Sequence, residues 1–333
     1  MKSRISVAAV LVVLGGSPYA VVQGLGASID PYYSANYTLM ELGSAPGVPQ
    51  PYGGLTLKAG DMNTLLIGGR ANYSDGKIYA VTVTRDAEKH ITGLTGTATV
   101  FADAYGVGGG IDGGLAYGPG GVLFYANYLC WAADNHLGQI KPGSTGPDKL
   151  IDLSPLGISS SVGSINFPYP GFPGAGHAKV LSYNASNWYD VTLSADGNGT
   201  YNIASVAPAI NLVSGADLEG VTFIPKGNAL FPNDSVLVSK FDTGVVDAYE
   251  VNNNGDPVVS SGRHFINGLT HAEGAYTDPL TGDFLFSIWG TSSDKVFVVR
   301  GFTPLPEPST LVLLAIGALS LLAYAWRRRR QPA

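Results

Sequence analysis

Acidic side chains stand directly before glycines at several widely spaced points of this 333-residue chain, within segments that repeat every 50 to 60 residues. If the repeated segments pack around one axis, their carboxylates converge and supply the oxygen ligands that a hard cation such as Ca²⁺ needs, six to eight in number. We therefore predict a metal site, with Ca²⁺ as the expected ion. Its ligands would be Asp112, Glu219 and Glu273, and Asp217 and His271 lie close to them in sequence.

Two facts weigh against a metal at these positions. The first and third repeats have only Gly53 and Gly163 in the same column, and an acidic residue before glycine is also an ordinary turn former. Solvated or hydrogen-bonded carboxylates lining a channel, a structural cation and a catalytic metal all remain open.

Other motifs that could carry chemistry are few. Residues 108–113 contain a G-x-G-x-x-G pattern, but it precedes a strand rather than a helix and so lacks the phosphate-binding geometry. The chain has no G-x-S-x-G, H-E-x-x-H or C-x-x-C motif, and its five histidines show no metal-ligand spacing. Aromatic residues of the stretch 166–174, with Trp131, Trp188, Tyr189 and Trp289, could stack on sugars or simply fill half-buried strand positions.

The elements around these residues repeat. Five segments begin with a small or acidic residue, a glycine and an apolar strand, followed by a turn and further strands; they start at Gly53, Gly113, Gly163, Glu219 and Glu273. A period near 50 residues with about four strands per unit is the signature of a β-propeller. We predict an all-β fold with five blades, with six blades as the alternative.

The ends of the repeat array indicate how the ring closes. The last repeat runs into a proline-rich segment after Val299 without a fourth strand, whereas residues 37–42 form a strand that precedes the first repeat. Pairing the two removes a free sheet edge, and we expect residues 28–302 to form the propeller.

The pairs Glu219-Gly220 and Glu273-Gly274 resemble repeat starts of gluconolactonase-like and paraoxonase-like propellers. This resemblance implies a catalytic metal held by such residues and a lactonase or esterase activity.

Composition narrows the choice of partners. Charged residues make up only 13% of the chain, and 45 glycines and 18 tyrosines favour short strands joined by tight turns. Without the terminal segments, 13 basic and 24 acidic residues remain, so the body carries a net charge near −11. Such a body repels phosphate backbones, which excludes nucleic acid as an expected partner.

The N-terminus has the pattern of a signal peptide. Lys2 and Arg4 precede an apolar run from residue 5 to residue 14, and small residues follow. The run is too short to span a membrane. We predict a signal peptide over residues 1–27, cleaved between Ala20 and Ala27.

The C-terminal segment, residues 303–333, combines three features in a fixed order. A proline-rich stretch with Pro306, Glu307 and Pro308 precedes an apolar run predicted to be a transmembrane helix over 310–326, and a basic cluster follows, made of Arg327, Arg328, Arg329 and Arg330. The basic cluster should stay cytoplasmic, which places the body outside the membrane.

These three features resemble the PEP-CTERM sorting signal, also labelled an ice-binding protein C-terminal domain. The resemblance implies export and cleavage near Pro-Glu-Pro by an exosortase, a membrane protease, in a Gram-negative bacterium that makes extracellular polysaccharide. The protein would be held in the inner membrane before processing and then reach the cell surface or the medium.

Two function classes follow for the body. Because the chain lacks a recognised nucleophile or base constellation, we favour a non-enzymatic surface or matrix protein that binds exopolysaccharide or a protein partner. The alternative is a secreted metal-dependent propeller hydrolase, in which the acidic column would hold the cation.

Overall fold

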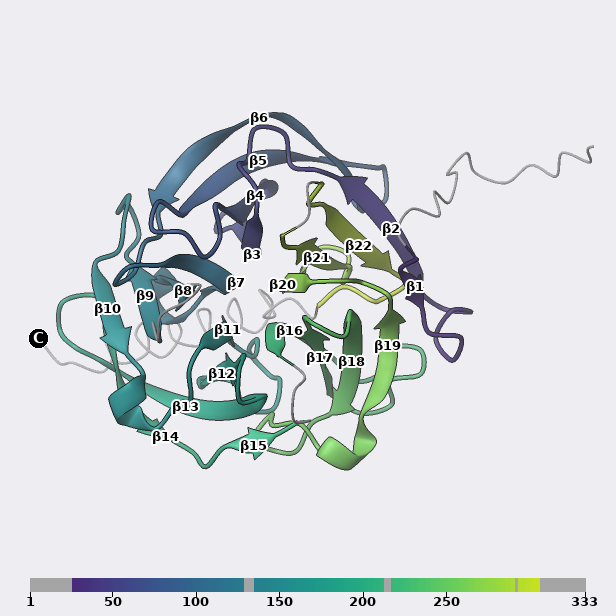
Figure 1. The fold of residues 1–333 in the computed structure, drawn as a ribbon. Helices are drawn as coiled ribbons and strands as arrows, with labels where there is room; N and C mark the ends of the chain where they lie inside the picture. Colours follow the sequence, from purple (N-terminus) through teal and green to yellow (C-terminus); the bar gives the residue numbers. More distant parts are fainter. Residues whose placement is uncertain (1–25, 129–134, 213–216, 291–292, 306–333) are drawn as a thin grey trace, which may run out of the picture.

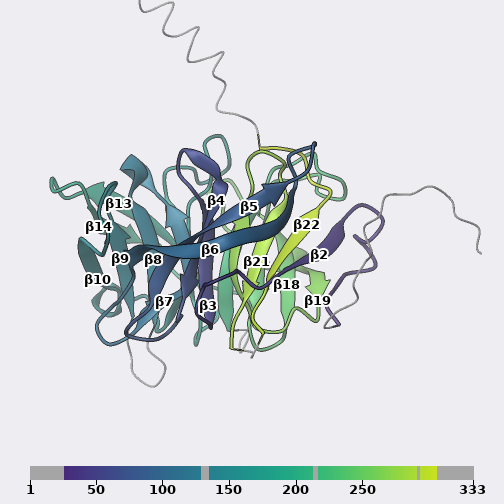
Figure 2. The same cartoon turned by 90° about the horizontal axis from the view of Figure 1, so that it is seen from above.

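A computed structural model shows five four- or five-stranded antiparallel sheets arranged around one axis (Figure 1). The structure describes residues 26–128, 135–212, 217–290 and 293–305. Each sheet is one blade of a propeller, and Figure 2 shows the disc from its side. The predicted five-bladed, all-β fold is confirmed.

Blades 1 and 2 are each built from four consecutive strands. Blade 1 contains β3 (Tyr52–Lys58), β4 (Asp61–Gly69), β5 (Lys77–Arg85) and β6 (Ile91–Asp103). Blade 2 contains β7 (Gly110–Tyr117), β8 (Leu123–Tyr128), β9 (His136–Ile140) and β10 (Lys149–Asp152).

Blade 3 also starts at the axis and proceeds outward, and a short extra strand pairs with its third strand. It contains β11 (Val162–Asn166), β12 (Ala178–Ser182), β13 (Asn187–Ala195), β14 (Tyr201–Val206) and β15 (Ile210–Asn211). The helical residues described are three 3₁₀ turns, η1 (Pro119–Gly121), η2 (Ser154–Leu156) and η3 (Val259–Ser261).

Blades 4 and 5 are completed by strands from the start of the described chain. Blade 4 contains β16 (Leu218–Ile224), β17 (Ser235–Lys240), β18 (Val245–Glu250), β19 (Arg263–Asn267) and β1 (Ser28–Ile29). Blade 5 contains β20 (Ala272–Thr277), β21 (Phe284–Ile288), β22 (Val296–Arg300) and β2 (Thr38–Gly43). The predicted closure is therefore confirmed, because β2 pairs with β22, and β1 adds a second closing strand to blade 4 that the repeat pattern did not predict.

The core is divided into five hydrophobic clusters, one at each interface between neighbouring blades. The inner strands are buried on both faces, as in β16, where every residue is buried. Outer strands alternate, as in β5, whose exposed side chains include Thr82 and Thr84. Burial on both faces explains why the sequences of the inner strands are continuous apolar and glycine runs.

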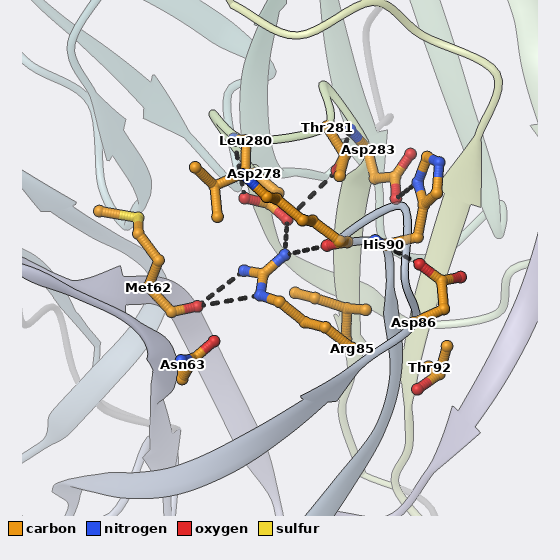
Figure 3. Close-up of polar contacts among 12 residues, drawn as sticks. Met62, Asn63, Arg85, Asp86, His90, Thr92, Asp278, Leu280, Thr281 and Asp283 are labelled. Atoms are coloured by element: carbon orange, nitrogen blue, oxygen red, sulfur yellow. Dashed lines mark hydrogen bonds and ion pairs between the residues drawn. The ribbon is translucent and has the colours of Figure 1, made fainter.

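Polar contacts reinforce the closing interface between blades 1 and 5 (Figure 3). Arg85, at the end of β5, donates from Nη1 to Oδ2 of Asp278 at 2.6 Å, and the Asp278 side chain is fully buried. His90 contacts Asp283, also fully buried, at 2.7 Å. Buried carboxylates need such partners, so these pairs fix the turn between β20 and β21 against blade 1.

The described residues include no helix long and apolar enough to cross a membrane. The predicted transmembrane helix over 310–326 and the predicted signal peptide up to residue 25 lie outside the described residues.

Candidate metal centre

The inner strand of every blade contains a β-bulge near the axis, and the three predicted acidic ligands lie in these bulges. Glu219 lies in the bulge of β16, between Leu218 and Val221, and Glu273 occupies the matching place in β20. The bulge of β7 holds one residue more, which brings Asp112 to the same level although it stands one position earlier in its repeat. Bulges change the direction of side chains, and here they direct carboxylates from blades 2, 4 and 5 to one point.

The carboxyl groups of Asp112, Glu219 and Glu273 meet at this point. Each offers one oxygen, and these oxygens all lie within 4.8 Å of one another. All three residues are buried, with no more than 2% of their surface exposed. The sequence-predicted set is therefore brought together by the fold.

Three buried oxygens of this cluster accept no hydrogen bond from any described residue: Oε2 of Glu219, Oε1 of Glu273 and Oδ1 of Asn72. Asn72 follows β4 of blade 1, and its backbone N–H donates to the carbonyl oxygen of Ile111 at 2.9 Å. Asn72 and the three acidic residues line one cavity of about 120 Å³. Since buried oxygens usually have partners, this set of hard oxygen donors fits a cation such as Ca²⁺.

Burial also sets the protonation of the cluster. It raises the pKa of Asp112 to about 7, although hydrogen bonds with Glu273, Asn72 and the Gly113 backbone lower that pKa in part. Burial and the neighbouring carboxylates raise the pKa values of Glu219 and Glu273 well above the ordinary glutamate range. Three like charges cannot share this site without a positive charge or bound protons.

Four aromatic side chains form the rest of the cavity wall, and we call them the aromatic rim: Tyr128, Tyr183, Phe241 and Trp289. Each stands at or directly after the end of the second strand of its blade, in blades 2 to 5. Neighbouring rings contact one another around the opening, with centroid separations of 6.3, 5.8 and 5.8 Å. The indole N–H of Trp289 donates to no described residue.

Asp217 and His271, the other two candidates, do not join the cluster of carboxylates. Both adopt left-handed backbone conformations, with φ of 46° and 56°. Their carbonyl oxygens accept the backbone N–H groups of Phe241 at 2.9 Å and Trp289 at 3.0 Å, and the His271 ring stacks on Phe241 at 4.5 Å. These residues therefore position the aromatic rim.

Asp217 has a second neighbour at the mouth, Asp242. Burial first, and then the hydrogen bond and charge of Asp242, raise the pKa of Asp217 to about 6. The Tyr183 hydroxyl lies 3.5 Å from Oδ1 of Asp242. The mouth thus carries two neighbouring carboxyl groups, Asp217 and Asp242, outside the cluster itself.

The aromatic residues singled out in the sequence separate into three groups. Trp289 belongs to the rim, whereas Trp188 and Tyr189 are buried in blade 3. Asn166, Phe167 and Tyr169 lie at the other end of the axis, around a different cavity. Trp131 and the sorting residues Pro306 to Pro308 and Arg327 to Arg330 lie outside the described residues. Four lining residues were not predicted from the sequence: Asn72, Tyr128, Tyr183 and Phe241. Each lies at or just after the end of the second strand of its blade, and this common position is visible only once the blades are aligned.

Comparison with known families decides the nature of the C-terminus. Residues 304–330 match the PEP-CTERM protein-sorting motif. The protein is therefore exported and processed at a membrane, and the motif implies an exosortase as the processing enzyme. The match does not extend into the propeller, and the comparison with curated proteins gives no match.

Solved structures similar to this chain are propellers of low sequence identity. One is described as a 6-phosphogluconolactonase from Bacteroides uniformis, with 14% identity, a TM-score of 0.42 and coverage of 80% of this chain and 71% of its own. An auxiliary nutrient binding protein from Bacteroides thetaiotaomicron has 10% identity, a TM-score of 0.43 and coverage of 79% and 76%. The calcium-binding protein regucalcin from Agrobacterium tumefaciens has 13% identity, a TM-score of 0.40 and coverage of 79% and 94%. We draw no functional conclusion from them.

Proposed function

We propose that this exported propeller binds a divalent cation of the Ca²⁺ type at Asp112, Glu219 and Glu273, with the amide oxygen of Asn72 as a further ligand. One observation carries the proposal: three buried carboxylates from three blades converge within 4.8 Å, and oxygens of Glu219, Glu273 and Asn72 lack donors among the described residues. A doubly charged cation offsets most of their negative charge. Ca²⁺ tolerates irregular geometry and several carboxylate ligands, whereas Mg²⁺ demands a near-ideal octahedron.

The aromatic rim supports a second part of this role, the binding of an oxygen-rich ligand at the mouth. Tyr183, Phe241 and Trp289 are half-buried around the cavity that leads to the carboxylates. Such rings stack on apolar faces of a ligand while a cation binds its oxygens. This arrangement suits a surface or matrix protein that binds a sugar unit of an exopolysaccharide or of a glycosylated partner.

The test is calorimetric titration of the full-length protein with Ca²⁺ after chelation. We expect one site per chain in the wild type and at least tenfold weaker binding in Glu219→Gln, because Ca²⁺ affinity follows ligand charge and number. Glu250→Gln makes the same chemical change at an exposed residue and should bind Ca²⁺ like the wild type. Titrations that detect no divalent cation in the wild type overturn the proposal.

A second candidate function is hydrolysis of a lactone or ester. The observation that favours it is the open mouth, where the carboxyl groups of Asp217 and Asp242 are neighbours and the Tyr183 hydroxyl lies beside Asp242. A cation bound at the cluster polarises a carbonyl and lowers the pKa of a bound water, and Asp217, with a pKa of about 6, is suited to take up a proton near neutral pH.

Initial rates on a panel of lactones and esters separate the two functions. A hydrolase should show Ca²⁺-dependent turnover that Glu219→Gln abolishes and that Asp217→Asn lowers without loss of Ca²⁺ binding. Absence of turnover by the Ca²⁺-loaded protein contradicts the hydrolase and leaves the binding role in place.

A further inference from the structure

A second cavity of about 210 Å³ opens at the opposite end of the propeller axis, and we call it the exit pocket. Its walls come from the last residues of the inner strands, whereas the carboxylates stand near their first residues. Glu273 and Thr277, for example, are four residues apart on β20, which corresponds to about 13 Å along a strand. Figure 2 shows the inner strands β3 and β7 running between these two faces. The two cavities are therefore separate sites.

The floor of the exit pocket carries hydroxyl groups. Thr56, Thr222 and Thr277 line it from blades 1, 4 and 5 and are buried. The hydroxyls of Thr222 and Thr277 are hydrogen-bonded to each other. A hydroxyl has one donor and two acceptor positions, so this pair retains capacity for further hydrogen bonds to a ligand.

The wall carries half-buried aromatic rings that are held by packing. Tyr276 packs against the core cluster between blades 1 and 5, and Tyr117 packs against the cluster between blades 1 and 2. Phe167 packs on Phe124 with a centroid distance of 5.1 Å. Rings held in this way lose little conformational freedom when a ligand stacks on them.

Two further polar groups point to a ligand with many hydroxyls. The Asn166 amide is held by a bond from Nδ2 to the Val221 carbonyl at 2.6 Å and accepts the Phe167 N–H at 2.7 Å. The Tyr169 hydroxyl is buried and has no hydrogen-bond partner among the described residues. None of the lining residues is charged, and the body as a whole is acidic, so an anionic ligand is disfavoured.

Beside the exit pocket, Tyr117 also lines a separate cavity of about 460 Å³, whose walls combine the apolar Phe101, Leu123 and Ile140 with the cationic Lys58 and Lys141. The uncharged lining is therefore a property of the exit pocket and not of its neighbour.

From these features we infer that the exit pocket binds one sugar unit of a neutral polysaccharide, with the sugar ring on the axis between Phe167 and Tyr276. Hydroxyls and one amide recognise the sugar hydroxyls, and the aromatic rings cover its apolar face. Leu305, which also lines the pocket, lies within the matched sorting motif. The site thus faces the side from which the chain continues into its sorting segment, and it is independent of the cation site.

The experiment is titration of the full-length protein with a panel of neutral oligosaccharides, namely α- and β-linked glucans, a mannan and a galactan, each of six sugars. We expect binding of at least one member, weakened about tenfold or more by Phe167→Ala through loss of stacking and about three- to tenfold by Thr222→Val through loss of one hydrogen bond. Phe167→Leu retains apolar packing and should weaken binding without lowering the melting temperature as much.

Glu250→Gln changes an exposed residue that lines neither cavity, and as the control it should bind the oligosaccharide like the wild type. No binding across the neutral panel overturns the inference, as does binding of an acidic polysaccharide alone. Binding that Tyr183→Ala abolishes and Phe167→Ala leaves intact places the sugar at the mouth and also overturns it. Failure of the cation proposal leaves every one of these outcomes unchanged.

Discussion

Replacing Glu219 by glutamine should raise the stability of the metal-free protein and reduce the stabilisation that Ca²⁺ provides. Without cation, the substitution removes a buried carboxyl whose charge is repelled by Asp112 and Glu273. With cation, it removes a ligand. We expect the metal-free variant to melt above the metal-free wild type, and Ca²⁺ to stabilise the wild type far more than the variant.

The magnitude follows from the geometry. Two unit charges 4.8 Å apart repel by about 3.5 kcal/mol at an effective dielectric of about 20. Glu219→Gln should therefore relieve about 3–4 kcal/mol, or roughly 6–16 °C in melting temperature at about 2–4 °C per kcal/mol.

The cation offsets part of this difference, because it stabilises the wild type more than the variant. Ligand at a hundredfold excess over its Kd stabilises the folded state by about 2.7 kcal/mol, and a tenfold weaker site gains about 1.4 kcal/mol at the same concentration. The assay is thermal melting of both proteins in chelator and in Ca²⁺, with Glu250→Gln as the control for loss of one surface charge. A metal-free variant that melts below the metal-free wild type refutes the reasoning, since the carboxylates would then stabilise one another without a cation.

The stability difference between the metal-free wild type and Glu219→Gln should grow as the pH rises. Because the folded-state pKa of Glu219 is raised and the unfolded-state value stays near 4.5, the folded state binds more protons, and the metal-free wild type loses stability as pH rises above about 4.5. The difference between wild type and Glu219→Gln should therefore vanish at pH 4 and below and grow toward pH 7. A difference that is constant over this range contradicts the assigned cause.

Four other predictions concern the surrounding structure. Arg85→Ala leaves the buried Asp278 carboxylate unpaired and should cost about 3–5 kcal/mol in chemical denaturation; a loss below 1 kcal/mol contradicts this. A Cβ at Gly113 would lie 2.3 Å from Glu219 Oε2, so Gly113→Ala should abolish Ca²⁺-dependent stabilisation while Gly146→Ala, with ordinary contacts only, preserves it. Deleting β2 should cause aggregation or loss of cooperative melting, and an unchanged melting curve would show that this strand is dispensable. Intact mass of the protein released from cells should lack the four C-terminal arginines, and a full-length tail on all of it argues against exosortase cleavage.

The repeat pattern predicted the blades because all five inner strands share one recognisable sequence pattern. Glycine followed by a continuous apolar strand at intervals of 50 to 60 residues specifies five equivalent positions at the axis. Closure by β2 followed from counting strands, since the last repeat lacked an outer partner. The short β1 could not be predicted this way, because two residues carry no periodicity and blade 4 already had its four strands.

The acidic cluster was predictable from the sequence, but the shape of its surroundings was not. Asp217 and His271 stand two residues before a glutamate, and sequence cannot show that their left-handed backbones direct them to the aromatic rim. Rim residues such as Tyr183 and Phe241 directly follow second strands, and in the sequence they cannot be told apart from the apolar residues of the core. Tertiary packing, rather than local pattern, decides which aromatic side chains face the mouth.

The glycines at the axis of blades 2 and 3 help to decide whether the fold is shaped to hold the carboxylate cluster. In the sequence, Gly163 seemed to weaken the metal hypothesis, because it leaves that blade without a ligand. In the structure, a Cβ at Gly163 would lie 2.9 Å from Glu219 Oε2, and one at Gly113 would lie 2.3 Å from the same atom. Such distances are too short for real contacts, so these glycines make the space that the Glu219 carboxylate occupies. A glycine at these positions therefore leaves room for the Glu219 carboxylate. The space at the axis limits the number of carboxylates, so the absence of an acidic residue from blade 3 does not weaken the metal hypothesis.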